Sequence, residues 1–135
     1  MVEIYITVNW DGKASRGEAA DAILIYNPDT DSKQIKVYGF KNVSYPLACA
    51  LAVTNALRLV DPCDVKMITE DAYTFTMMQK TDFSSYKNRE IWEEFARCRD
   101  KMPSFTFERI KDHRFKSASI YHTEKGGYKM YDVGK

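Results

Sequence analysis

Acidic residues at two places in the sequence could bind a metal ion. Asp11 and Gly12 follow an N-terminal apolar stretch, and Glu70 and Asp71 come directly after the apolar segment Val65–Thr69. Carboxylate oxygens are the ligands that Mg²⁺ prefers. Asp11, Glu70 and Asp71 therefore have side chains of the type that a hard cation binds. Each pair also has an ordinary structural interpretation. Asp11-Gly12 could form a hairpin turn, and Glu70 and Asp71 could simply be acids favoured by the dipole of the following helix.

A second group of residues could contact phosphate. Phosphate contacts need clustered cations and hydrogen-bond donors rather than a high net charge. The candidates lie in the loop beside Asp11 and before a predicted helix: Lys13, Ser15, Arg16, Asn42 and Ser44. Basic residues also outnumber acidic ones from 101 to 129. The alternative interpretation is that these are ordinary solvated side chains on a surface whose positive and negative charges balance.

Composition limits the class of protein. The 135 residues carry 20 basic and 19 acidic side chains, which gives a formal net charge of +1. This balance excludes a bulk polycation, and 44% hydrophobic residues are enough for a core. The chain has no apolar run long enough for a membrane span, and its N-terminus lacks the pattern of a signal peptide. Three widely spaced cysteines suit a reducing compartment, so we expect a cytoplasmic protein without a membrane partner.

Hydrophobic periodicity predicts the elements that position these residues. Strict alternation over 2–10 predicts a strand, and strands at 22–26 and 33–40 would complete an antiparallel meander. Three- and four-residue spacing then predicts a helix over 45–60, with Ser44 as its N-cap. The remaining predicted elements are a strand at 65–69, helices at 71–79 and 88–101, and a strand at 105–110. Residues 119–121 and 128–133 could form a hairpin, or the end of the chain could be a loosely held extension.

This order of elements resembles the ribonuclease H-like family. Four motifs carry the resemblance: Trp10-Asp11-Gly12, Thr69-Glu70-Asp71-Ala72-Tyr73, Ile91-Trp92 and Lys111-Asp112-His113. The resemblance implies an α/β fold with a five-stranded mixed sheet flanked by helices. It implies a ribonuclease H-like domain over 1–119 and an extension over 120–135. By the same resemblance, Asp11, Glu70 and His113 would be catalytic residues, and Asp11, Glu70 and Asp71 would be ligands of Mg²⁺. The loops that carry the phosphate-contacting candidates would bind nucleic acid.

The family holds two Mg²⁺ ions with four acidic residues, and this sequence matches two of them. Asp11 matches the acid of the first strand, although another alignment puts Val8 there; strand alternation favours Asp11. Glu70 matches the acid after the fourth strand. The first helix has no acid, because no Asp or Glu occurs from 33 to 60. The C-terminal acid is missing too, so relocated acids would be needed: Glu18 or Asp21 for the helix, and Glu124 or Asp132 for the C-terminus.

The resemblance and the incomplete acid set lead to three hypotheses. The first is a ribonuclease H-like domain that binds an RNA–DNA hybrid or structured, duplex RNA, with weakened or absent cleavage. The second is an active Mg²⁺-dependent ribonuclease that uses Asp11, Glu70 and a relocated acid. The third is a protein-interaction scaffold, because a fold alone does not establish function. The first two depend on one prediction, that Asp11 and Glu70 end neighbouring strands side by side.

Overall fold

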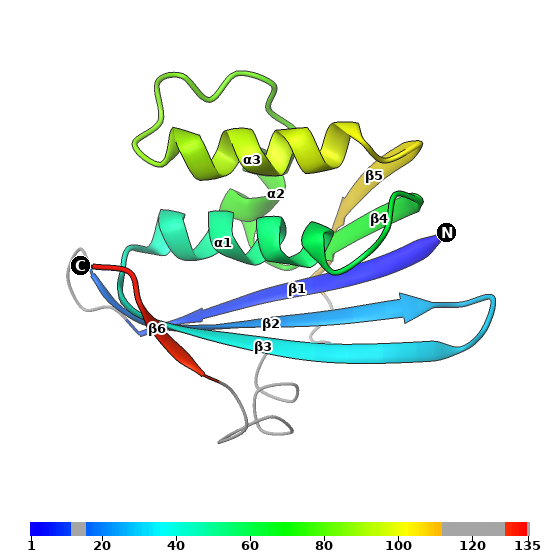
Figure 1. Cartoon of the computed structure of the whole chain (residues 1–135), viewed down its shortest axis with the longest axis horizontal. Helices are drawn as coiled ribbons and strands as arrows, with labels where there is room; N and C mark the ends of the chain where they lie inside the picture. Colours follow the sequence, from blue (N-terminus) through cyan, green and yellow to red (C-terminus); the bar gives the residue numbers. More distant parts are fainter. Residues whose placement is uncertain (12–15, 112–128, 135) are drawn as a thin grey trace.

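A computed structural model describes residues 1–11, 16–111 and 129–134 of the chain. Helices α1, α2 and α3 lie together on one face of a mixed sheet (Figure 1). The sheet has six strands in the order β5-β4-β1-β2-β3-β6. The elements, in chain order, are β1 (Val2–Trp10), β2 (Gly17–Asn27), β3 (Ser32–Val43), α1 (Tyr45–Arg58), β4 (Asp64–Thr69), α2 (Ala72–Met78), α3 (Arg89–Asp100), β5 (Ser104–Arg109) and β6 (Met130–Asp132).

Strand pairing follows the predicted meander. β1 pairs antiparallel with β2, and β2 pairs antiparallel with β3. β4 lies parallel to β1 and to β5, so a helix must connect each of these parallel pairs. Alternation in β1 places Ile4 and Ile6 in the main core, where they are almost completely buried. The predicted mixed α/β sheet is confirmed.

Helix α1 packs closely on the sheet because the buried side of its surface carries small residues. Ala48, Ala52 and Ala56 are fully buried there. The helix begins as predicted, since the Ser44 hydroxyl accepts a hydrogen bond from the Leu47 N–H at 3.3 Å. This N-cap places the start of α1 beside the ends of β1 and β3, where the candidate site residues converge.

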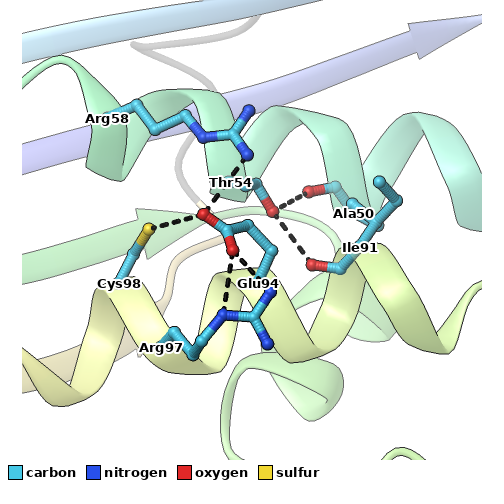
Figure 2. A network of polar contacts seen from close by, with 7 residues as sticks. All are labelled: Ala50, Thr54, Arg58, Ile91, Glu94, Arg97 and Cys98. Atoms are coloured by element: carbon cyan, nitrogen blue, oxygen red, sulfur yellow. Dashed lines mark hydrogen bonds and ion pairs between the residues drawn. The ribbon is translucent and has the colours of Figure 1, made fainter.

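Helix α3 is held against α1 by polar contacts at the edge of the core (Figure 2). Glu94 forms ion pairs with Arg58 of α1 at 3.3 Å and with Arg97 of its own helix at 2.6 Å. The buried Thr54 hydroxyl donates to the Ala50 carbonyl at 2.7 Å, which satisfies it inside the helix contact. The Arg58–Glu94 ion pair therefore joins α3 to the last turn of α1, at the end of the helix away from Ser44.

The sheet differs from the prediction at its edges. It has six strands rather than five, because Met130–Asp132 pairs parallel with Gly39–Lys41 of β3. Strand β2 begins at Gly17 rather than at residue 22, and β3 continues to Val43 rather than ending at residue 40. The other half of the predicted C-terminal hairpin, 119–121, lies outside the described residues. No helix in the described part of the chain is long and apolar enough to cross a membrane.

Candidate functional site

Asp71 is the centre of a hydrogen-bond network that joins the start of α1 to α2. It is the N-cap of α2, and its Oδ2 accepts from the Thr74 N–H at 2.8 Å and from the Thr74 hydroxyl at 2.6 Å. Its Oδ1 accepts from the Tyr45 hydroxyl, and the Cys49 thiol lies 3.9 Å from Oδ2. Both carboxylate oxygens are therefore surrounded by protein donors from α1 and α2.

Asp21 is a second carboxyl group on the same side of the sheet. It lies in β2 opposite Val8 of β1 and Tyr38 of β3, and its side chain is fully buried. Neither of its oxygens has a hydrogen-bond partner among the residues that the structure describes. Burial raises the pKa of Asp21 well above its ordinary value of 3.8. Burial without a partner therefore disfavours the charged form of this side chain.

Cys49 of α1 lies between these two carboxyl groups. Burial raises the pKa of its thiol to about 12, and the negative charge of Asp71 adds to the shift, whereas hydrogen bonds with Thr74 and Tyr45 oppose it. The thiolate is the nucleophilic form of cysteine, so a thiol with this pKa is inert at neutral pH. This cluster therefore resembles a structural polar network more than a nucleophilic site.

The structure does not bring Asp11 next to Glu70. Ile6 pairs with Thr69, so Glu70 lies one residue past this pair and Asp11 lies five residues past it. Asp11 therefore lies four residues further along the strand direction than Glu70. At ~3.3 Å per residue, this offset is about 13 Å. Asp11 instead extends the β1–β2 hairpin: its N–H donates to the Glu18 carbonyl at 3.0 Å, and its Oδ1 accepts from the Glu18 N–H at 2.9 Å.

A pocket of about 340 Å³ opens beside the start of α1. Its polar and basic lining comes from three separate segments: Arg16 before β2, Ser44 before α1, and Lys87 and Asn88 before α3. Aromatic side chains form another part of the wall, where the Tyr73 and Trp92 ring centroids lie 6.4 Å apart. The pocket can therefore offer cations, hydrogen-bond donors and ring faces to one ligand.

The predicted phosphate-contacting residues partly converge at this pocket. Asn42 has a φ of 56° at the end of β3, and its carbonyl accepts from the Arg16 guanidinium at 2.6 Å. Arg16, Asn42 and Ser44 thus lie together around the start of α1. Lys13, Ser15 and His113 lie outside the described residues.

Comparison with known proteins identifies the fold. No protein-family model matches the sequence, and no curated protein matches it. LC11-RNase H1 in complex with an RNA/DNA hybrid superimposes with a TM-score of 0.67 at 18% identity, over 88% of this chain and 90% of that one. RNase H1 from the archaeon Halobacterium salinarum gives a TM-score of 0.68 at 11% identity, over 88% of each chain. The N-terminal RNase H domain of a Mycobacterium tuberculosis protein gives 0.65 at 8% identity, over 83% of this chain and 89% of that one.

This chain has a ribonuclease H-like fold. The resemblance implied two Mg²⁺ ions, but the described residues do not fit such a pair. No group of three or more His, Cys, Asp or Glu side chains within 1–11, 16–111 and 129–134 could hold a metal ion. Asp71 faces O–H, N–H and S–H donors, which a cation would have to displace. Pro46 stands in the first turn of α1, and that turn has no acidic residue.

Sequence reasoning missed several residues of this candidate site. Asp21 was considered only as a replacement for a missing acid, whereas it is a buried neighbour of the Asp71 network. Lys87 and Asn88 were assigned to a loop and to a helix start, without a binding role. The only sequence signal for them is a basic residue followed by Asn at a helix start, which is too common to indicate a site.

Proposed function

We propose that this chain is a ribonuclease H-like domain that binds nucleic acid, an RNA–DNA hybrid or duplex RNA, with weak or absent Mg²⁺-dependent cleavage. The observation that carries the proposal is the pocket at the start of α1, lined by Arg16, Ser44, Lys87 and Asn88. These side chains combine positive charge with neutral hydrogen-bond donors. That combination suits a phosphate–sugar backbone.

Binding through the pocket would depend on local charge rather than on net charge. Arg16 and Lys87 are both exposed, and both line the pocket. The positive end of the α1 dipole adds to the attraction for an anion at the same place. Duplexes of the A form are recognised by shape and by their 2′-hydroxyl groups, which suits Asn and Ser side chains such as Asn88 and Ser44.

Weak cleavage follows from the state of the acidic residues. Two-metal hydrolysis requires carboxylates that converge on ions about 4 Å apart. Asp71 is occupied by hydrogen bonds, burial disfavours the charged form of Asp21, and Asp11 lies in a hairpin away from Glu70. We therefore propose that any Mg²⁺ bound near these acids supports little hydrolysis.

The binding proposal is tested with a fluorescent RNA–DNA hybrid and fluorescence anisotropy at several salt concentrations. Lys87→Gln removes one pocket cation, and it should weaken binding and lower the salt slope by about 0.9 for the lost phosphate contact. Lys33→Gln is the matched control, because Lys33 is equally exposed but lies at the opposite end of β3. Equal affinity and slope for Lys87→Gln and the parent chain would contradict the proposal.

A further inference from the structure

The C-terminal segment of the structure contacts Asn42, one of the predicted phosphate-contacting residues, which remains exposed. We call residues 129–134 the C-terminal strap; it contains β6. The side-chain N–H of Asn42 donates to Asp132 Oδ1 of the strap at 2.9 Å, and the Gly134 N–H donates to the same oxygen at 3.1 Å. Gly134 lies so close to Asn42 that a Cβ on Gly134 would be 2.4 Å from the Asn42 Cβ. The strap therefore forms a hydrogen bond with the Asn42 side chain and packs directly against it.

Within the part of the chain that the structure describes, a short strand pairing, two backbone hydrogen bonds and the packing of Val133 attach the strap to the sheet. Its strand pairs with only three residues of β3, and hydrogen bonds of 3.1 Å join Gly39 N–H to the Lys129 carbonyl and Val133 N–H to the Lys41 carbonyl. The Tyr131 ring lies 6.0 Å from that of Phe40, yet Tyr131 remains 46% exposed. Segments with few buried contacts at the end of a chain open at low free energy.

The strap also brings a negative charge to the proposed surface. Asn42 connects the Asp132 carboxylate to Arg16, because the Arg16 guanidinium binds the Asn42 carbonyl and also lines the pocket. In Figure 1, β6 runs toward the end of the sheet at which α1 begins, in agreement with the contact between Asp132 and Asn42. A phosphate group that approaches Asn42 would meet a carboxylate already bound to it.

We propose that the C-terminal strap is an intramolecular competitor of nucleic acid for the surface around Asn42. This inference rests on the proposed function and adds its regulation. When the strap is in place, Asp132 occupies the Asn42 amide and repels phosphate. When a nucleic acid binds, the strap leaves β3, and Asn42 becomes available to the ligand.

Two full-length variants test the competition in different ways. Asp132→Asn removes the charge but keeps an oxygen that can accept from Asn42 and from Gly134. Gly134→Ala keeps the charge but forces the strap away from Asn42, because the new Cβ has no space. Asp61→Asn is the control: it also removes an exposed carboxylate, but after α1, at the end of the helix away from the pocket.

In hybrid-binding assays, we expect both strap variants to bind about three- to tenfold more tightly than the parent, the effect of one lost repulsion or one lost competing hydrogen bond. Asp61→Asn should bind like the parent. Hydrogen exchange provides a second measurement: the Val133 amide, bonded to Lys41 in the free protein, should lose protection when hybrid is added.

The outcomes separate this inference from the proposed function. If the parent binds hybrid but the strap variants bind no more tightly, or Val133 stays protected in the complex, the competition is refuted and the binding function stands. If only the strap variants bind, the competition is upheld in its strongest form. If neither the parent nor a variant binds, both the function and the competition are refuted.

Discussion

The buried carboxyl group of Asp21 makes the stability of this protein depend on pH. Asp21 is fully buried without a hydrogen-bond partner, and its pKa in the folded chain lies well above 3.8. In the unfolded chain the same group has its ordinary pKa and loses its proton as the pH rises above about 4. The unfolded state then binds fewer protons than the folded state. Stability therefore falls as the pH rises from the unfolded pKa to the folded pKa.

The size of this effect follows from the linkage relation. Between the two pKa values, one proton of difference lowers the free energy of unfolding by about 1.4 kcal/mol per pH unit. Asp21→Asn keeps the size and shape of the side chain but cannot ionise. We expect this variant to lose that contribution to the slope, and to be more stable than the parent above about pH 6, after the unfolded group has ionised.

Urea denaturation of both chains from pH 4 to pH 8 measures the difference directly. Asp29→Asn is the control, because Asp29 is an exposed carboxylate in the turn between β2 and β3. Its slope should match that of the parent. Parallel curves for Asp21→Asn and the parent across this range would show that Asp21 is not held in its neutral form, and would refute the reasoning.

Two further substitutions test the polar contacts around α1. Tyr45→Phe removes the hydroxyl that donates to Asp71 but keeps the ring, whose centroid lies 5.8 Å from that of Tyr73, so it should lower the free energy of unfolding by about 1 to 3 kcal/mol; unchanged stability in urea would contradict this network. Glu94→Gln removes the negative partner of Arg58 and Arg97, so it should lower the thermal midpoint slightly in low salt and not in high salt. An equal decrease at both salt concentrations would show that Glu94 acts through packing rather than charge.

The sequence predicts the order of elements because each one has a clear hydrophobic period. Alternation through Ile4 and Ile6 identifies β1, and Ser44 before an apolar repeat identifies the start of α1. Strand β6 could not be assigned to the sheet in the same way. Its three residues are exposed, and it joins the sheet by pairing with β3, a contact that depends on distant residues.

The candidate site was less predictable because its chemistry depends on burial and register. Asp11 was predicted to meet Glu70, but the register of β1 and β4 separates them. The alternative interpretation of Asp71, an acid that stabilises the start of a helix, agrees with its role as the N-cap of α2. Nothing local to Asp21 indicates that it is buried without a partner, because that state requires α1 to pack over β2.

The most direct test of the proposed function is to incubate the parent chain with a labelled RNA–DNA hybrid and Mg²⁺, and to measure binding and strand cleavage in the same sample. The account predicts binding at ~50 mM salt that weakens steeply as salt is added, with the RNA strand remaining essentially intact. Rapid RNA cleavage that is lost in Asp11→Asn would contradict it, because Asp11 would then belong to a working metal site. Absence of binding at ~50 mM salt would contradict it as well, because phosphate contacts are strongest there.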